Sequence, residues 1–420
     1  MMKLLIIADD FTGALDTGVQ FAAKGAATCV VTDPSYDFGQ VGQEVQVLVM
    51  DAETRHLPGQ DAYRVVYRAV RSALDAGFSY IYKKTDSGLR GNIGAELTAV
   101  MDASGADHLP FLPAFPKMDR ITRDGIHYIS GIPVADSVFG QDPFEPVQVS
   151  TVAEIIGQQS QAPVVLCSRE READAPGIRV YDAATDEDLR AIGFRLGQKG
   201  LRISAGCAGF ASVLAELLAL SGKPPRLPKL VPSLFVTCGS VNPVTQRQLK
   251  VAQAAGFPRF RLRAEQKLDL AWTDCPGCVD AIRAWLEQAG SAGLCILDAN
   301  DEDGSSETQD YALARGLSAE EIRQRISTTL GRLMKRLLDS GLNATLMCTG
   351  GDTLMAMMRQ VSVSELVPVC ELAPGVVLTD FTYHGTLYHI ISKSGGFGEP
   401  DLLCSLANLL GVEKKEDTVC

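Results

Sequence analysis

The first half of the chain alternates between short apolar runs and longer segments in which apolar residues recur at helical spacing. The short runs are rich in β-branched residues, which favours strands, and the longer segments are typical of amphipathic helices. The expected strands are Lys3–Ala8, Thr28–Thr32, Val45–Met50 and Phe78–Lys83, and the expected helices are Asp61–Asp75 and Gly94–Asp102. Strands that alternate with helices form parallel βαβ units, so we expect an α/β fold with a mostly parallel sheet.

Prolines interrupt this alternation near the middle of the chain. Four of them stand between Ser221 and Pro232, too close together for a helix or an interior strand to continue. We interpret this segment as a linker between two α/β domains, residues 1–225 and 226–420, with the ligand site in the cleft between them. After the linker the alternation resumes, with expected strands at Leu234–Cys238, Leu294–Asp298 and Ala344–Cys348 and an expected helix at Val244–Ala255.

One helix of the second half has a sequence signature at both ends. Ser318 and Glu321 form a capping box, and Gly341 supplies a C-terminal stop. Between them, apolar residues recur at helical spacing at Ile322, Ile326, Leu330, Leu333 and Leu337. Two segments do not follow the alternation. We expect residues 109–146 to form a functional loop region and residues 300–309 to form a solvated loop.

Charge and composition narrow the classes of function. The chain has 420 residues and a formal net charge of −12, which argues against an extended basic surface for nucleic acid or anionic lipid. A small anionic ligand held by a few local groups remains compatible with that charge. Asp9 and Asp10 cut the N-terminal apolar run below the length of a signal peptide, and no stretch approaches the roughly 18 apolar residues of a membrane span. We therefore expect a soluble cytoplasmic protein, with its eleven cysteines reduced and mostly buried.

Charged residues gather where three expected strands of the first domain end. Asp9 and Asp10 follow the first strand, Arg55 follows the third, and Lys84, Asp86 and Arg90 follow the fourth. Adjacent carboxylates repel each other and lose solvation on burial, a cost that a cation, a metal or a ligand hydroxyl can offset. Alternatively, Asp10 or Thr12 caps the next helix, and Arg55 and Arg90 are solvated surface charges. Because ligands bind beyond the carboxyl ends of parallel strands, we favour one shared crevice.

Glycines mark the corresponding strand ends of the second domain. Gly350-Gly351-Asp352-Thr353 follows an expected strand and opens a helix, and backbone N–H groups at such a position can hold a phosphate. Gly239-Ser240 and Lys393-Ser394-Gly395-Gly396-Phe397-Gly398 are similar loops. Together they indicate a nucleotide-phosphate cradle, although the chain has no GxxxxGK[ST] loop, GxGxxG fingerprint or protein-kinase catalytic loop.

These motifs, in this order, occur together in a known family. The chain resembles the four-carbon acid sugar kinases, which use ATP to phosphorylate the terminal hydroxyl of threonate, erythronate or 3-oxo-tetronates. The resemblance covers nearly the whole chain and rests on the ordered set Ala8–Ala14, Lys84–Ser87, Leu89–Asn92, Pro113–Pro116, Arg120, Thr122, Gly125, His127, Asp142-Pro143, Pro146, Gly239-Ser240, Gly350–Thr353, Pro374-Gly375 and Lys393–Gly398. Two positions depart from the family pattern: Asp119 stands where a glycine commonly precedes the arginine, and Thr54 stands where a serine commonly precedes Arg55.

The resemblance implies a division of labour between the domains. The N-terminal domain would bind the sugar acid, through Asp9, Asp10, Arg55, Lys84, Asp86, Arg90 and Asn92. The C-terminal domain would bind ATP, through Ser240, Gly350, Gly351, Asp352, Thr353, Lys393, Gly395, Gly396 and Phe397. We expect Mg²⁺ to bridge ATP oxygens, with the amides of Gly350 and Gly351 and the amine of Lys393 facing the phosphates.

Phosphoryl transfer also needs a group that accepts the hydroxyl proton, and Asp10 and Asp86 are the candidates for that catalytic base. The alternative is that both aspartates only bind substrate hydroxyls. Among substrates, the motif set favours D-threonate, with D-erythronate and 3-oxo-tetronate as alternatives. A sugar-acid phosphatase is disfavoured because Asp9 and Asp10 are adjacent rather than spaced as D-x-D, and a periplasmic binding protein is disfavoured because no export signal is recognised. Neither nucleic acid nor membrane is an expected partner, and homodimer formation is left open.

Overall fold

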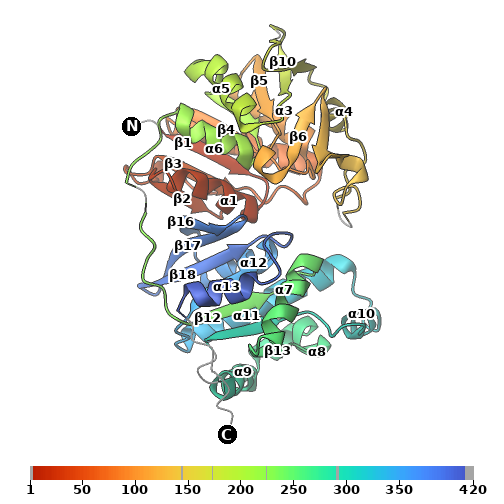
Figure 1. The fold of residues 1–420 in the computed structure, drawn as a ribbon, viewed down its shortest axis with the longest axis vertical. Helices are drawn as coiled ribbons and strands as arrows, with labels where there is room; N and C mark the ends of the chain where they lie inside the picture. The colour runs from red at the N-terminus through yellow and green to blue at the C-terminus, as the bar shows by residue number, and fades with distance from the viewer. Residues whose placement is uncertain (1–2, 143–144, 173, 224, 290–292, 412–420) are drawn as a thin grey trace. The chain divides into compact units, whose positions relative to one another are not determined.

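The computed structural model describes residues 3–142, 145–172, 174–223, 225–289 and 293–411 of the chain (Figure 1). Its contacts divide the chain into two compact units, Met1–Pro225 and Arg226–Cys420, which we call unit 1 and unit 2. Pro143 and Pro224, which entered the sequence analysis, lie outside the described residues. Within the described ranges, no disulfide links the cysteines and no helix is long and apolar enough to cross a bilayer.

Unit 1 is built on a parallel sheet with the strand order β2-β3-β1-β4-β11-β5-β10-β9. The strands are β1 (Leu4–Ala8), β2 (Thr28–Val31), β3 (Val47–Asp51), β4 (Tyr80–Lys84), β5 (His108–Leu112), β9 (Val164–Cys167), β10 (Gly177–Tyr181) and β11 (Ile203–Gly206). Residues on both faces of β1, β3 and β4 are buried, which explains why these strands appear as continuous apolar runs rather than as alternating patterns.

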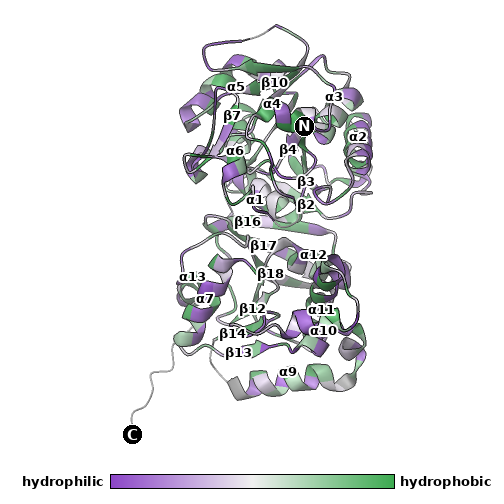
Figure 2. Ribbon diagram, turned by 90° about the vertical axis from the view of Figure 1, so that its right-hand side faces the viewer, coloured by the Kyte–Doolittle hydropathy of each residue, from purple (hydrophilic) through white to green (hydrophobic). Residues whose placement is uncertain are grey.

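Helices cover both faces of this sheet. On one face α1 (Phe11–Ala22) packs on α6 (Ala208–Leu217), which packs on α5 (Asp186–Gly200). On the other face α2 (Gly59–Asp75) packs on α3 (Ile93–Ser104), which packs on α4 (Val152–Gly157). The buried residues of α2 recur at Ala62, Val66, Ala69, Val70 and Ala73, at the spacing of one helix face. In Figure 2 the strands are mostly green, whereas α2 has a green side and a purple side.

The strand order places β1 between β3 and β4, so that the chain builds the sheet first to one side of β1 and then to the other. The register of the strands aligns Ala8 with both Asp51 and Lys84, the last residues of the two flanking strands. Such a reversal of strand order opens a crevice at the carboxyl ends of the strands. The loops after β1, β3 and β4 therefore begin next to one another.

Unit 2 has the strand order β13-β14-β12-β15-β18-β17-β16. Its strands are β12 (Leu234–Cys238), β13 (Arg259–Arg261), β14 (Leu294–Asp298), β15 (Thr345–Thr349), β16 (Glu365–Ala373), β17 (Val376–Tyr383) and β18 (Thr386–Lys393). The strands from β13 to β18 in this order are parallel, and β17 and β16 extend the sheet in antiparallel pairing. The expectation of two α/β domains with mostly parallel sheets is thus confirmed.

Helices of unit 2 pack in pairs against this sheet. The helix α11 (Ala319–Asp339) packs on α12 (Gly351–Val361), and α7 (Pro243–Ala254) packs on α13 (Leu402–Leu409). The predicted capping box at the start of α11 is confirmed, because the Ser318 hydroxyl accepts from the Glu321 N–H and the Glu321 carboxylate accepts from the Ser318 N–H. Unit 2 also contains the helices α8 (Ala264–Leu268), α9 (Pro276–Ala289) and α10 (Glu307–Leu313).

Two expectations about loops were wrong. The segment expected as a loop at residues 109–146 begins inside β5 and continues as a small antiparallel sheet of β6 (Arg120–Arg123), β7 (Ile126–Ile129) and β8 (Ile132–Pro133). Strands this short carry too few residues to show a period. The β6–β7 turn does have a local signal, because Asp124 and Gly125 both have positive φ, as a two-residue hairpin requires. The segment 300–309 also contains the start of α10.

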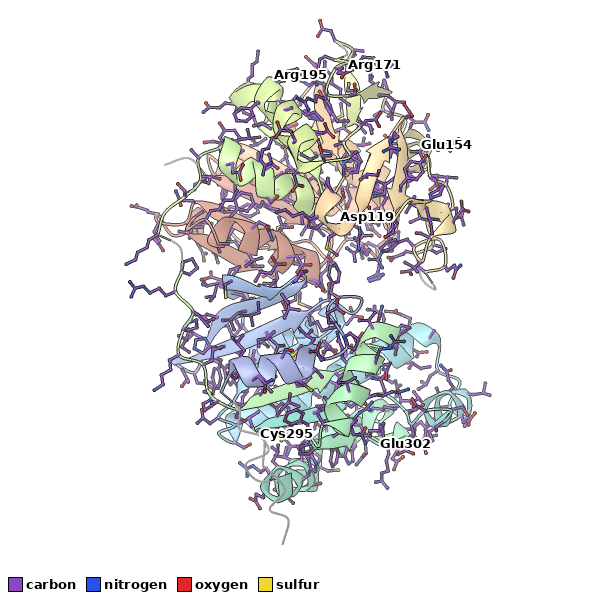
Figure 3. The ribbon with its side chains drawn as sticks, viewed as in Figure 1. Asp119, Glu154, Arg171, Arg195, Cys295 and Glu302 are labelled. Atoms are coloured by element: carbon purple, nitrogen blue, oxygen red, sulfur yellow. The ribbon has the colours of Figure 1, made fainter. Side chains whose placement is uncertain are left out.

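Asp119, labelled in Figure 3, adopts the conformation that a glycine would adopt at its position. Its φ is 53° and its ψ is 38°, in the left-handed region that glycine enters freely. Aspartate is one of the few other residues that visits this region routinely. Asp119 thus occupies the glycine position of the family pattern in a backbone conformation that is open to aspartate.

His127 of β7 is fully buried and anchors the loop after β4. Its Nε2 donates to the Ser87 carbonyl at 2.9 Å, and its Nδ1 accepts from the Thr122 hydroxyl at 3.1 Å. These partners fix the neutral ring with the proton on Nε2, because a carbonyl can only accept. Burial lowers the pKa of His127 to about 4, although the bond to Ser87 acts in the opposite direction.

We therefore expect acid to destabilise the protein through His127. Its pKa is lower in the folded chain than in the unfolded one, so stability is lost as pH falls from about 6.5 toward 4, by about 2 kcal/mol between pH 7 and pH 5. Urea unfolding of the wild type and of His127→Gln at both pH values measures this contribution as a difference of differences. An equal loss of stability in the two proteins would assign the acid sensitivity to other groups.

Candidate functional site

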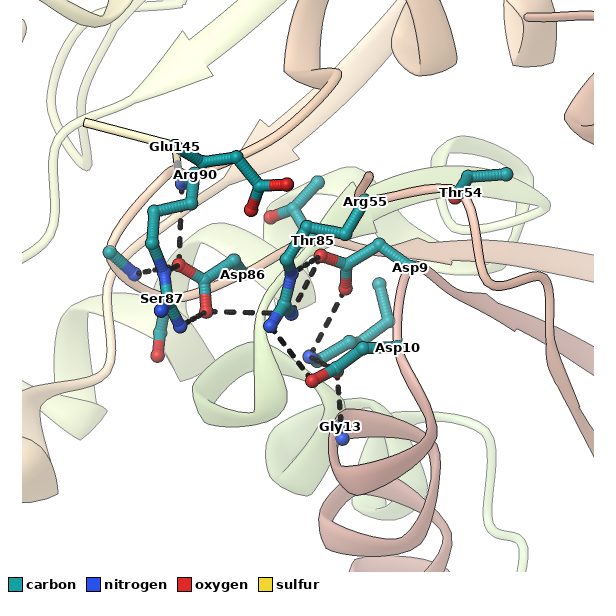
Figure 4. Close-up of polar contacts among 12 residues, drawn as sticks. Asp9, Asp10, Gly13, Thr54, Arg55, Thr85, Asp86, Ser87, Arg90 and Glu145 are labelled. Carbon is teal, nitrogen blue, oxygen red and sulfur yellow. Dashed lines mark hydrogen bonds and ion pairs between the residues drawn. The ribbon is translucent and has the colours of Figure 1, made fainter. Parts of the chain in front are cut away.

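Arg55 lies at the centre of a charged cluster at the carboxyl ends of β1, β3 and β4 in unit 1 (Figure 4). Its Nε and Nη2 lie 2.8 Å and 2.7 Å from Oδ2 of Asp9, and its Nη1 lies 2.8 Å from Oδ2 of Asp10. Its Nη2 also lies 3.6 Å from Oδ1 of Asp86. One guanidinium thus contacts carboxylates that follow β1 and β4, while Arg55 itself follows β3. The side chains that follow these three strands therefore meet, as predicted.

Lys84, the last residue of β4, lies on the other side of the two aspartates that follow β1. Its Nζ is 3.4 Å from Oδ1 of Asp9 and 3.7 Å from Oδ1 of Asp10. Asp10 is also the N-cap of α1, accepting from the Gly13 N–H at 2.9 Å. The two interpretations of Asp10 from the sequence, a helix cap and a member of a charged cluster, therefore both hold.

Asp86 and Arg90 form a two-pronged ion pair within the loop after β4. Nε and Nη2 of Arg90 lie 2.8 Å and 3.1 Å from the two carboxylate oxygens of Asp86, which also accepts from the Gly88 and Arg90 N–H groups. Nη1 of Arg90 reaches Asp142 at 3.0 Å. Phe139 stacks under the guanidinium of Arg90, 5.1 Å from the ring centre. The Asp86 carboxylate is therefore fully engaged by the chain itself.

The cluster keeps Asp9 and Asp86 ionised although both are buried. Burial alone would raise the pKa of Asp9, but Arg55 and Lys84 outweigh it and bring the pKa to about 2. For Asp86 burial is likewise the largest influence, yet Arg90 and Arg55 together hold its pKa well below the usual range. Asp10 differs from both, because 27% of its side chain is exposed, against 2% for Asp9 and 9% for Asp86. Asp10 is thus the most accessible of the three carboxylates.

Asn92 supports the cluster from behind. Its amide donates to the carbonyls of Thr54 and Leu57, each at 2.8 Å, and its side-chain oxygen accepts from Gln159 at 3.0 Å. These bonds hold the loop that carries Arg55. A direct bond from Asn92 to a substrate stays a prediction.

Three polar side chains next to the cluster, Arg120, Lys83 and Glu96, had no predicted role in the site. Arg120 donates to the Ser87 hydroxyl, and its guanidinium lies over the Phe139 ring, 5.1 Å from the ring centre. Lys83 and Glu96 form a buried ion pair 3.1 Å long. Two adjacent lysines at a strand end were the available signal for Lys83, since neighbouring side chains point to opposite faces of a sheet.

The glycine loops of unit 2 also meet, at the carboxyl ends of β12, β15 and β18. A methyl group added to Gly395 would lie 2.9 Å from the Ser240 hydroxyl, and one added to Gly350 would lie 3.7 Å from Cβ of Ser240. Gly350 has a φ of 91°, which only glycine adopts readily. Ser240, Gly350 and Gly395, which come from separate predicted motifs, therefore line one place.

Lys393 holds the third of these loops together. Its Nζ donates to the Thr245 hydroxyl at 2.8 Å and to the carbonyls of Ser394 and Gly395, each at 3.0 Å. Burial lowers the pKa of this amine to about 8. All three N–H bonds of the ammonium group are used within unit 2. The predicted contact of Lys393 with phosphate would therefore need one of these bonds to be exchanged.

The start of α12 provides backbone donors beside Ser240. Gly351, Asp352 and Thr353 open the helix, so their N–H groups have no acceptor within it. The Gly350 N–H is already used, because it donates to the Lys393 carbonyl at 3.0 Å. The Asp352 carboxylate lies 2.7 Å from Nη1 of Arg323 on α11.

Phe397 belongs to the glycine loop after β18, and its ring packs on Gly375. A methyl group added to Gly375 would lie 2.5 Å from the Phe397 ring, so the ring packs on this glycine. Gln248 of α7 donates to the carbonyls of Phe397 and Gly398 at 3.0 Å and 2.9 Å. A methyl group on Gly396 would lie 3.6 Å from the amide nitrogen of Asn242. The loop after β18 is therefore held against the start of α7.

Comparisons with known proteins agree with this division of the chain. Residues 4–214 match the family model of a sugar-binding N-terminal domain, and residues 235–403 match that of a nucleotide-binding C-terminal domain. D-threonate kinase of Salmonella typhimurium is 31% identical over 96% of this chain and 97% of that protein. D-erythronate kinase of Heliobacterium modesticaldum is 30% identical over 100% of this chain and 99% of that protein. The chain belongs to the four-carbon acid sugar kinase family.

The fold of this kinase recurs in solved structures. A crystal structure of a protein from Salmonella typhimurium LT2 superposes with a TM-score of 0.80, covering 98% of this chain and 100% of that one, at 21% sequence identity. The kinase class makes the chain a phosphotransferase, and its nucleotide-binding domain implies the use of ATP. The resemblance stated from the sequence motifs is thereby confirmed at the level of the family.

Gly13 offers a test of the geometry around Lys84 in this kinase. A methyl group at Gly13 would lie 1.9 Å from Nζ of Lys84 and 2.5 Å from Oδ1 of Asp10, so Gly13→Ala must displace both groups. Because misplacement by about 1 Å can cost on the order of 10²-fold in rate, we expect kcat/KM for the acid to fall by roughly that factor. The matched control is Gly157→Ala at the end of α4, where a methyl group meets nothing within 4 Å. Steady-state kinetics of both variants decide, and equal activity would remove Lys84 and Asp10 from the site.

Proposed function

We propose that this kinase transfers the γ-phosphate of ATP to the terminal 4-hydroxyl of a four-carbon sugar acid, with D-threonate as the preferred substrate. The observation that carries the proposal is the cluster around Arg55, in which three carboxylates and three cations converge at the switch point of the unit 1 sheet. Relatives named for D-threonate and D-erythronate at 31% and 30% identity support the four-carbon class. The preference between these acids rests on the motif set alone.

In this proposal unit 1 binds the sugar acid. Arg55, Lys84 and Arg90 supply the positive charge that attracts the substrate carboxylate, and a guanidinium can bind it through two parallel hydrogen bonds. Asp9 and Asp10 accept hydrogen bonds from substrate hydroxyls, as ionised carboxylates do. Asp86 holds Arg90 in place, and Asn92 holds the loop of Arg55.

We assign the catalytic base to Asp10 rather than to Asp86. A base must reach the substrate hydroxyl and have room to accept its proton. The oxygens of Asp86 already accept from Arg90, Gly88 and the Arg90 backbone, and its pKa is held well below the usual range against the effect of burial, chiefly by Arg90. Asp10 is the more exposed carboxylate, and its bonds to Arg55 and Gly13 fix its orientation.

Unit 2 binds ATP in this proposal. The N–H groups of Gly351, Asp352 and Thr353 face the phosphates at the positive end of α12, with Ser240 and the loop Gly395–Phe397 on the facing side. Lys393 sets the shape of that loop. Mg²⁺ binds proteins through one or two carboxylates and completes its shell with phosphate oxygens and water. In this proposal the Asp352 carboxylate, which lies 2.7 Å from Nη1 of Arg323, would exchange that partner to bind the metal. The metal would neutralise charge on the transferred phosphate.

The assignment of the base is tested by Asp10→Asn and Asp86→Asn. Asparagine caps a helix as well as aspartate does, so Asp10→Asn should keep α1 intact while kcat falls by ~10²-fold or more. Asp86→Asn should chiefly raise KM for the acid, because it loosens Arg90, and should affect kcat less. Steady-state kinetics with saturating ATP separate the two effects. Near-normal kcat in Asp10→Asn together with a large loss in Asp86→Asn would transfer the base to Asp86.

The substrate is tested by ADP release from protein, ATP and Mg²⁺ with a panel of D- and L-threonate, D- and L-erythronate and 3-oxo-tetronate. We expect the highest kcat/KM with D-threonate. A higher value with another acid of the panel would correct the stereochemical assignment within the same class. No acid-dependent ADP with any of them would reject the proposed function.

A further inference from the structure

Beneath the Arg55 cluster lies a second, fully buried ion pair. Lys83 precedes Lys84 on β4 and therefore points to the opposite face of the sheet, toward α3. Its Nζ lies 3.1 Å from Oε2 of Glu96 on α3, and the two side chains are 0% and 1% exposed. Neither Lys83 nor Glu96 bonds to the cluster carboxylates of Asp9, Asp10 and Asp86, as Arg55 does.

Lys83 joins the ends of two strands of the site. Besides Glu96, its Nζ donates to the Ile7 carbonyl at 3.2 Å and to the Lys84 carbonyl at 2.8 Å. Ile7 lies two residues before Asp9, and Lys84 lies two residues before Asp86. The ammonium group thus fixes the backbone just before the two loops that carry the carboxylates of the cluster.

Glu96 joins the third strand end to the same pair. Its Oε1 accepts a hydrogen bond from the Thr54 hydroxyl. The N–H groups of Thr54 and Arg55 both donate to the Asp9 carbonyl, at 3.1 Å and 3.2 Å. Thr54 therefore links the buried pair to the backbone that joins Arg55 to Asp9.

A buried ion pair is a poor way to gain stability. Desolvation of the two charges offsets most of their attraction, and an apolar pair of similar volume is often equally stable or more stable. Burial is the largest influence on the pKa of Glu96 and raises it, whereas Lys83 and the hydrogen bond from Thr54 lower it. What the pair does supply is a fixed geometry, because Lys83 Nζ donates to the carbonyls of Ile7 and Lys84 and Glu96 Oε1 accepts from Thr54.

We propose that Lys83 and Glu96 are positioning residues that orient Arg55 through Thr54 and thereby set the affinity for the acid. The inference rests on the proposed function of the Arg55 cluster. It extends the site to a layer on the other face of the sheet, whose residues never touch substrate or nucleotide.

The first test removes only the hydroxyl that links the pair to the Arg55 loop. We expect Thr54→Val to lower kcat/KM for the acid at least 10-fold while KM for ATP stays within 2-fold, and we expect Thr54→Ser to restore the wild-type value, since serine keeps the hydroxyl. The matched control is Thr345→Val, which removes an equally buried hydroxyl bonded to the Val231 carbonyl in unit 2 and should leave both constants unchanged. Unchanged acid kinetics in Thr54→Val would overturn the inference.

The second test separates positioning from stability. Each single variant, Lys83→Met or Glu96→Met, leaves one buried charge alone and should lower the melting temperature, whereas the double variant should recover much of it. We expect the double variant to keep a loss of at least 10-fold in kcat/KM for the acid. Recovery of both stability and acid kinetics would show that the pair is only structural. If the double variant does not fold, the Thr54 variants decide the question.

A crystal structure of Thr54→Val measures the orientation of Arg55 without any activity. A displaced guanidinium, no longer bonded to Asp9 as in the wild type, supports the inference even if no acid of the panel is a substrate. An unchanged Arg55 would overturn it even if the enzyme is active. The failure of the proposed function and the failure of this inference are therefore distinguishable.

Discussion

The site of unit 1 depends on one guanidinium shared by three carboxylates. Burial and mutual repulsion disfavour the ionised forms of Asp9 and Asp86, so a cation must lie between them to keep both charged. Arg55 provides that cation, and it can do so because its planar group offers donors in several directions at once. Loss of one partner of such a buried pair typically costs about 3–5 kcal/mol, so the position of Arg55 constrains every loop at this edge of the sheet.

The sequence was informative where local signals and the fold agree. The strands Leu234–Cys238 and Leu294–Asp298 have the bounds that their apolar runs predicted, and the long helix starts after its capping box at Ser318. The bounds of other strands shifted by one or two residues. For example, β4 runs one residue further than its expected end, because Lys84 still pairs with Ala8 of β1. The small sheet of β6 to β8 could not be found from periodicity, since its strands have only two to four residues.

The convergence of the candidate site residues followed from one rule, that parallel strands end at the same edge. That rule places Asp9, Arg55 and Asp86 in one crevice, and it places Ser240 with Gly350. The rule does not predict which groups a side chain will form hydrogen bonds with. Lys393, expected to face phosphate, donates to Thr245 and to two carbonyls, and such a choice depends on atoms that neighbouring sequence does not specify. The partnership of Lys83 with Glu96 likewise requires knowing that α3 crosses the far face of β4.

The completeness of the ion pairing in unit 1 has a consequence for selectivity. Arg55, Lys84 and Arg90 each already lie within 4 Å of a carboxylate of the chain, so an entering anion competes with internal carboxylates for them. When the anion binds, each cation exchanges a carboxylate of the chain for the anion. The total number of ion pairs therefore changes little. Affinity should accordingly respond weakly to ionic strength, and a neutral sugar of the same shape, which has no charge to exchange, should be excluded.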